Sequence, residues 1–99
     1  MITIKHTPHR IEVTGHAGYA DVGHDIVCAS ISTLVQNLIW SIEDLTEDII
    51  QYDVNTGETV ITYGNLSEHA QLLLDSFFIG CNAVAATCPE YVRVTNVKS

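Results

Sequence analysis

The sequence predicts an α+β domain in which a mainly antiparallel sheet packs two helices on one face, in the order β-β-α-β-β-α-β. Short runs of alternating apolar and polar residues indicate strands, and two longer runs with apolar residues at helical spacing indicate helices. Turn residues separate the strands in pairs, which is typical of hairpins. The 99 residues suit a single domain over 1–99.

The N-terminal part of the chain predicts a β-hairpin followed by a glycine-rich loop. Apolar and polar residues alternate over 1–7 and again over 10–14, and Pro8-His9 between them is a turn signal. The segment 15–23 follows, and its glycines predict a loop with unusual backbone freedom. These glycines are Gly15, Gly18 and Gly23.

The first helix is expected to begin near Asp25, because Asp is a good N-cap residue. We expect it to stop where the acidic stretch 43–48 begins, since acids at a helix C-terminus oppose the macrodipole. One apolar stripe recurs at helical spacing. It consists of Val27, Ile31, Leu34, Val35, Leu38 and Ile42.

The second half of the chain repeats the strand–strand–helix order. Strands are expected over 49–54 and 58–63, joined by a short glycine-containing turn. Asn65 resembles an N-cap for a second helix that ends at Pro89, and 91–97 alternates as a last strand. The apolar face of this helix consists of Ala70, Leu73, Leu74, Phe77, Cys81 and Val84.

Composition limits the partners that the chain is expected to have. Twelve acids against four bases give a formal net charge of −8, which disfavours nucleic acid and would attract a basic protein or peptide. The alternative, which is favoured where acidity is the sole argument, is that this charge serves solubility. The N-terminus has no secretory apolar run, and we expect no apolar stretch near the ~20 residues of a membrane span. The chain is therefore expected in the cytoplasm, and without a CxxC pair or histidines at ligand spacing we expect neither metal nor cofactor.

The segment 15–32 contains the candidate catalytic residues. We expect it to place His16 on the glycine-rich loop and Cys28 in the first turn of the first helix. If Asp25 is the N-cap, the Cys28 thiolate lies beside unpaired backbone N–H groups that would stabilise it and could bind an oxyanion. An imidazole within reach takes the thiol proton and returns it to a leaving amine. The alternative is that Cys28 is a small buried residue, which is the commoner role of a lone cysteine.

Three neighbouring residues have open roles. Asp25 either caps the helix or orients the imidazole as the acid of a triad does. Ser32 lies one turn after Cys28, where its hydroxyl bonds near the sulfur or returns to a helix carbonyl. His24 is a second imidazole near Cys28 and an alternative base.

The run Gly15-His16-Ala17, followed by Gly23, Asp25, Val27-Cys28-Ala29 and Ser32, resembles the signature of the ribosomal-processing cysteine proteases known as Prp. Length and element order extend the likeness over the whole chain. The resemblance implies a homodimeric protease with Cys28 as nucleophile, His16 as base, and Asp25 and Ser32 in support. It also implies a substrate that is cut after paired aromatic residues in an apolar groove beside Cys28. In the family this is the N-terminal extension of a bacterial large-subunit ribosomal protein, or a phage capsid or scaffold protein.

Two other functions stay open on the sequence alone. One is a non-catalytic, ribosome-associated binding module that kept the fold, and the other is a thiol-dependent hydrolase for another acyl substrate. A variant without the Cys28 thiol separates the binding module from a protease. Product masses from a peptide and a small ester separate the two kinds of hydrolase.

Overall fold

The computed structural model describes residues 1–15, 22–55 and 57–97, and for 22–25 it describes the backbone alone. Within these residues the element order is β-β-α-β-β-α-β, as predicted. The elements are β1 (Ile2–Thr7), β2 (Arg10–Thr14), α1 (Val22–Leu45), β3 (Ile50–Asn55), β4 (Glu58–Tyr63), α2 (Glu68–Thr87) and β5 (Val92–Asn96).

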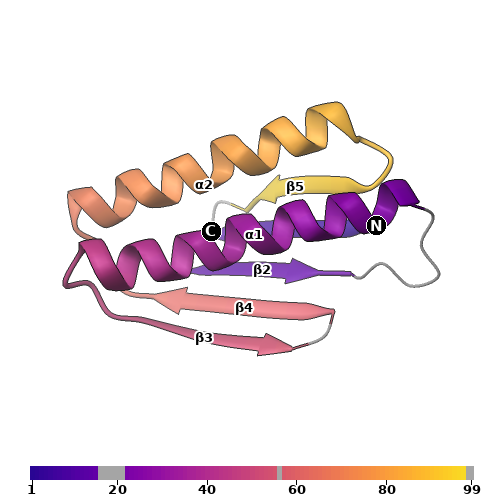
Figure 1. Ribbon diagram of the computed structural model, residues 1–99. Helices are drawn as coiled ribbons and strands as arrows, with labels where there is room; N and C mark the ends of the chain where they lie inside the picture. Colours follow the sequence, from indigo (N-terminus) through magenta and orange to yellow (C-terminus); the bar gives the residue numbers. More distant parts are fainter. Residues whose placement is uncertain (16–21, 56, 98–99) are drawn as a thin grey trace.

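The strands form one sheet in the order β3-β4-β2-β1-β5 (Figure 1). The pairs β1–β2, β2–β4 and β3–β4 are antiparallel, and β1–β5 is parallel. The sheet is therefore mixed but mainly antiparallel, which confirms the predicted class. The parallel pair forms because the chain returns through α2 to the far side of β1, a crossover that a hairpin cannot make.

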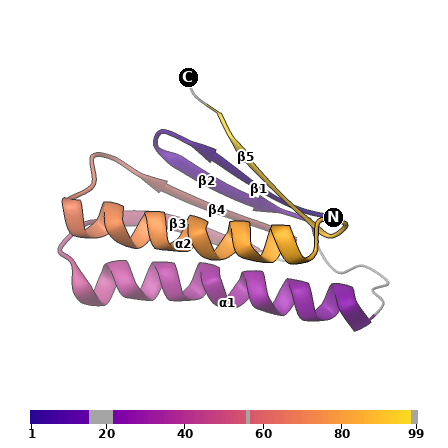
Figure 2. The same ribbon diagram turned by 90° about the horizontal axis from the view of Figure 1, so that it is seen from above.

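Both helices cover the same face of the sheet, and the described chain leaves the other face open (Figure 2). Since side chains alternate along a strand, every second residue faces the helices. The register places Ile4 beside Val13 and Val94 on that side, and Ile4 is fully buried. The molecule thus has two layers, and its core lies between them.

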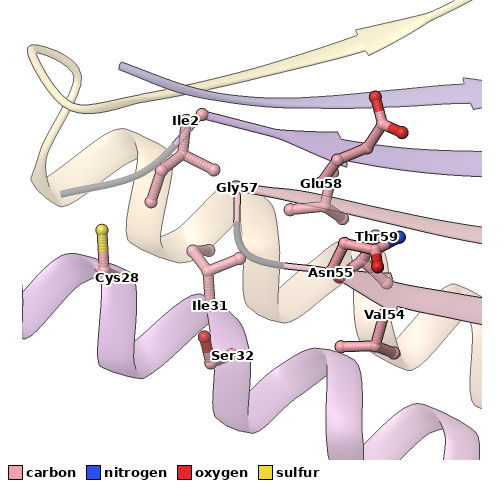
Figure 3. Close-up of a pocket in the computed structure, with 11 residues that line it drawn as sticks. Ile2, Cys28, Ile31, Ser32, Val54, Asn55, Gly57, Glu58 and Thr59 are labelled. Carbon is pink, nitrogen blue, oxygen red and sulfur yellow. The ribbon is translucent and has the colours of Figure 1, made fainter. Parts of the chain in front are cut away.

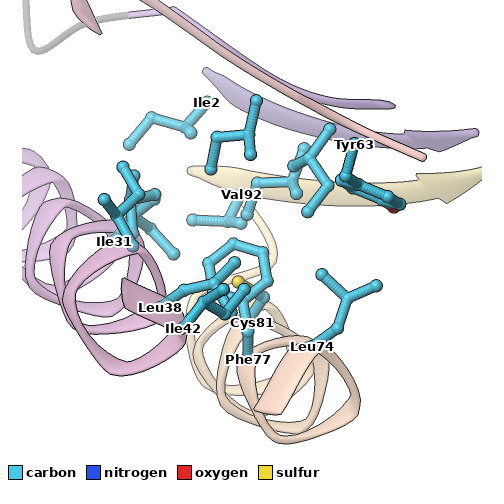
Figure 4. Packing of buried hydrophobic residues seen from close by; sticks show 14 of the residues in the cluster. Ile2, Ile31, Leu38, Ile42, Tyr63, Leu74, Phe77, Cys81 and Val92 are labelled. Atoms are coloured by element: carbon cyan, nitrogen blue, oxygen red, sulfur yellow. The ribbon is translucent and has the colours of Figure 1, made fainter. Parts of the chain in front are cut away.

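The core consists of aliphatic side chains and Tyr63 from the sheet and of one stripe from each helix (Figure 4). The predicted stripe of α1 is buried except for Leu34, which is half-buried and packs against α2 at Gly80. A Cβ at Gly80 would lie 2.9 Å from a Leu34 methyl group, so the helices approach closely at this glycine. The buried residues of α2 are Ala70, Leu74, Phe77 and Cys81.

Two predicted helix starts are wrong. The first helix begins at Val22, three residues before the expected N-cap Asp25. The N-cap of α2 is Ser67 rather than Asn65, and its hydroxyl accepts a hydrogen bond from the Ala70 N–H at 3.1 Å. Asp48 holds Ser67 in place by accepting from its N–H and hydroxyl at 2.7 and 2.6 Å. That contact joins distant parts of the chain, so local sequence does not reveal it.

By length and mean hydropathy alone, Ile26–Leu45 and Glu68–Thr87 are each sufficient to cross a membrane, so the expectation that no apolar stretch approaches that length is wrong. Core helices pass the same test, and both of these segments pack their apolar stripes on the sheet. In the most apolar stretch of each segment, 33% of the residues of the first and 22% of those of the second are buried. The apolar stripes of both helices therefore contribute to the core of the fold.

Candidate active site

Cys28 lies in a cleft of about 240 Å³ at the end of the sheet where α1 begins (Figure 3). Three parts of the chain form its walls: the first turns of α1, the ends of β1 and β2, and the β3–β4 hairpin. The lining residues are Ile2, Val13, Gly15, Cys28, Ile31, Ser32, Val54, Asn55, Gly57, Glu58 and Thr59. Four of them are aliphatic, so the cleft offers apolar surface beside a thiol.

The Cys28 side chain is half-buried, since it both packs against the core and borders the cleft. It is the seventh residue of α1, so the expectation that it lies in the first turn is wrong. At this depth the backbone N–H of Cys28 belongs to the helical hydrogen-bond ladder, and the dipole effect has fallen off. The Cys28 N–H is therefore unavailable as an oxyanion donor.

Ser32 lies one turn after Cys28 on the same face of α1 and borders the same cleft, as expected (Figure 3). Its neighbours Ser30 and Thr33 donate to the carbonyls of Ile26 and Ala29 at 2.9 Å. Within the described part of the chain, the Ser32 hydroxyl makes no such bond to a helix carbonyl. It is therefore available to a molecule in the cleft.

Gly15 fixes the point at which the chain leaves the sheet beside the cleft. Its φ of +102° lies in a region that other residues rarely adopt. Its N–H donates to the Gly57 carbonyl at 3.0 Å, and a Cβ would overlap the Met1 carbonyl oxygen. Position 15 therefore requires glycine, both because of its positive φ and because a side chain would clash with Met1. The backbone freedom expected here is not observed, since Gly15 adopts one defined conformation.

The other predicted site residues lie on or before the first turn of α1. His16 and Gly18 fall outside the described residues. Gly23 is the second residue of α1 rather than part of a loop, and Asp25 is the fourth rather than the N-cap. Val22 and Gly23 are weak helix formers, so propensity gave no sign of this earlier start. The capping role of Asp25 is therefore excluded, while its orienting role stays a prediction.

The wall formed by the β3–β4 hairpin was not foreseen. Val54 and Asn55 are far from Cys28 in sequence and reach the cleft through the sheet order. Glu58 also borders the cleft, but its carboxylate points away from Cys28 (Figure 3). Only the hairpin itself was visible in the sequence, since nothing local indicates which edge of the sheet it occupies.

Cys81 has the opposite environment. It is fully buried in α2, and desolvation raises the pKa of its thiol to about 12, which keeps it neutral. Its expected packing role is confirmed. Among the described residues, no group of three or more His, Cys, Asp or Glu side chains is placed to hold a metal ion.

Comparison with known proteins gives consistent matches. A family model described as cysteine protease Prp matches residues 1–93. The ribosomal processing cysteine protease Prp of Staphylococcus aureus is 31% identical over 83 residues, which cover 81% of this chain and 78% of that protein.

Two crystal structures of the Staphylococcus aureus protease share the fold. One contains a substrate peptide, with a TM-score of 0.91 and 24% identity over 98% of this chain and 100% of that chain. The other contains a covalently linked product peptide, with a TM-score of 0.85 and 28% identity over the same shares.

Proposed function

The chain belongs to the Prp family of cysteine proteases, and we propose that Cys28 is its nucleophile and His16 its general base. The observation that carries this proposal is the place of the Cys28 thiol in an open cleft that Gly15 also borders. His16 follows Gly15 directly in the chain, and Gly15 is the last described residue before it.

The proposed reaction has two steps. The imidazole removes the thiol proton, the sulfur bonds to the scissile carbonyl carbon, and the C–N bond breaks as the imidazolium protonates the leaving amine. Water then attacks the thioester, giving its proton to the imidazole, and the thiol is restored as the acid product leaves. Asp25 is proposed to orient the imidazole, and Ser32 to hydrogen-bond substrate beside the sulfur.

We propose the short N-terminal extension of a bacterial large-subunit ribosomal protein as substrate, with a phage capsid or scaffold protein as the alternative. The Staphylococcus aureus relative is named as a ribosomal processing protease, and a net charge of −8 attracts basic ribosomal sequences. The aliphatic walls of the cleft suit apolar residues next to the cut. Such a substrate places the enzyme in the cytoplasm.

The family likeness also leads us to propose a single-domain homodimer over 1–99 that needs no cofactor, metal, nucleic acid or membrane. Large apolar side chains on the outer helix surfaces support a protein interface. Ile26 and Trp40 on α1 are 61% and 60% exposed, and Leu72 and Ile79 on α2 are 65% and 72% exposed.

The test is a panel of N-terminal peptides from the host's ribosomal and capsid proteins, with cleavage sites read by mass. We expect one peptide class to be cut at a single bond, and Cys28→Ala to abolish the cut while folding and molecular size stay unchanged. Cleavage that persists in Cys28→Ala would falsify the assignment. Binding without any cleavage by the wild-type chain would instead favour a non-catalytic binding module.

The base is tested with a matched pair of histidine variants. We expect His16→Gln to lower kcat by at least about 10²-fold, in line with the loss of a general base. His24→Gln removes an imidazole at the start of α1 and should leave kcat within about twofold. The reverse pattern would assign the base to His24.

A further inference from the structure

We propose that the outer edge of β3 binds one arm of the peptide substrate as an additional strand, in continuation of the Cys28 cleft. The proposal rests on the proposed function, because its occupant is the peptide that Cys28 cuts. It adds a second recognition element, formed by backbone groups of β3 and by the side chains of Tyr52 and Val54.

β3 is suited to strand pairing because it ends the sheet. The strand order places β4 on one side of it and no described strand on the other. An edge strand presents unpaired N–H and C=O groups, and proteins usually block such edges with Lys, Pro or bulges. The sequence of β3, IQYDVN, contains neither Lys nor Pro, and its one charged residue is Asp53.

The edge continues directly from the cleft. Val54 and Asn55, at the C-terminal end of β3, line the same cleft as Cys28. From there the strand runs about 17 Å, at about 3.3 Å per residue, to the end of α1 that carries the acidic stretch 43–48. The Tyr52 hydroxyl lies 3.5 Å from a Glu43 carboxylate oxygen, which joins β3 to that stretch. A peptide lying in the cleft can therefore follow the edge as an extended chain.

Two exposed apolar side chains give this edge specificity. Tyr52 pairs in register with Ile61 and Val54 with Thr59, so both lie on the helix-facing side of the sheet. Ile61 is 1% exposed, whereas Tyr52 is 46% and Val54 59% exposed. These are core-side positions that the described chain leaves uncovered. Apolar side chains of an added strand would pack on them as cross-strand neighbours.

Charge favours a basic peptide over a second copy of this chain. Asp53 lies in the middle of β3, and the described cations Lys5, Arg10 and Arg93 are on the other side of β4. An antiparallel pairing of two β3 strands would bring two Asp53 carboxylates together, which is destabilising. A peptide with Lys or Arg near Asp53 gains the attraction instead.

Binding is measured first, apart from chemistry. Cys28→Ala serves as an inactive background, and the probe is the best-cut peptide of the panel, carrying a fluorophore, with anisotropy as the readout. We expect Val54→Ala and Tyr52→Ala each to raise Kd about tenfold, equivalent to about 1.4 kcal/mol. The control is Val97→Ala, which removes an exposed apolar side chain just after β5 at the opposite edge of the sheet and should leave Kd within about twofold.

In the active enzyme, Tyr52→Ala should raise KM and leave kcat within about twofold, because Tyr52 is not among the residues that line the Cys28 cleft and its loss removes binding rather than chemistry. Asp53→Lys should raise KM for a basic peptide by about fivefold and leave a neutral peptide unchanged. Asp75→Lys on α2 is its control, since it makes the same change in net charge away from the edge.

Strand pairing itself is tested in the peptide. N-methylation of successive amides in the arm that follows β3 should lower kcat/KM at every second position, since alternate residues of an added strand donate to β3. Equal losses at consecutive positions would overturn the proposal. So would β3 variants that reduce molecular size and leave KM unchanged, because the edge would then join two copies. Wild-type cleavage that depends on Cys28 shows in the same assays that the proposed function holds in either case.

Discussion

Cys28 and Cys81 lie on the two helices of one layer, yet their thiols have different surroundings. Cys28 is half-buried where α1 borders the cleft. Cys81 lies on the stripe of α2 that faces the sheet and is fully buried. Burial raises the pKa of Cys81 to about 12, which leaves almost no thiolate at neutral pH.

The difference shows that the position of a cysteine relative to the two layers decides its chemistry. In the sequence, Cys81 belongs to the apolar stripe of its helix, and Cys28 directly follows Val27, the first residue of the other stripe. Only Cys28 is near the end of the sheet, where the ends of β1 and β2 and the β3–β4 hairpin leave a cleft open. A thiol in the middle of the layer is excluded from water and from substrate alike.

The largest expected effect is on kcat/KM, when each of the two cysteines is replaced by alanine in turn. Cys28→Ala should lower kcat/KM by at least about 10³-fold, the scale of losing a catalytic nucleophile, with little change in stability. Cys81→Ala should keep kcat/KM within about twofold and lower the free energy of unfolding by about 1–2 kcal/mol through a small cavity. Peptide cleavage and urea unfolding measure the two quantities, and a large activity loss in Cys81→Ala would break the contrast.

The two thiols should also differ strongly in their rates of alkylation. At pH 8 a thiol of pKa about 12 has a thiolate fraction of about 10⁻⁴, roughly a thousandfold below that of an ordinary cysteine. Iodoacetamide is therefore expected to modify Cys28 long before Cys81, as peptide masses over time would show. In denaturant the two rates should converge, and faster native labelling of Cys81 would contradict its burial.

Gly15 should be the most sensitive glycine at the cleft. Gly15→Ala is expected to lower the free energy of unfolding by about 3 kcal/mol, because a side chain there meets both a positive φ and the Met1 carbonyl. Gly64→Ala is the control, since its Cβ would meet no atom within 4 Å, and it should stay within about 0.5 kcal/mol. Chemical denaturation measures both, and equal effects would remove the special role of Gly15.

The smallest effect is expected far from the cleft, at the start of α2. Ser67→Ala should lower the free energy of unfolding by about 1 kcal/mol through loss of the N-cap, with kcat/KM unchanged. Thermal unfolding and the peptide assay measure these effects. A loss of cleavage in Ser67→Ala would mean that this end of the molecule is coupled to the cleft.

The contact between Asp48 and Ser67 predicts that the stability of the fold depends on pH. Hydrogen bonds from the Ser67 hydroxyl and N–H lower the pKa of Asp48 below 3.8. The stabilisation is therefore present above pH 3.8 and is lost as the pH falls through the lower folded pKa. The difference in thermal unfolding between the wild type and Asp48→Asn should be full at pH 7 and should shrink as the pH falls below 3.8. A constant difference across this range would contradict the ionic role.

The strands and helices could be predicted from the amino-acid sequence, because their signals are local. The alternation of 10–14 and 58–63 gave the strand bounds, and the helical spacing of Val27 to Ile42 gave the buried stripe of α1. The Prp signature around Cys28 likewise lies within one short segment. The family could therefore be predicted from that segment and is confirmed by the match over residues 1–93, whereas the catalytic roles of Cys28 and His16 stay a proposal.

Contacts between distant residues set the features that local signals could not predict. The parallel pairing of β1 with β5, the Asp48 bonds that fix Ser67 as N-cap, and the hairpin wall opposite Cys28 each join residues far apart in sequence. Helix propensity also did not indicate that α1 starts at Val22, a start that places Cys28 in the second turn. Periodicity reports which face of an element is apolar, but only packing of the layers decides which end of that face stays open.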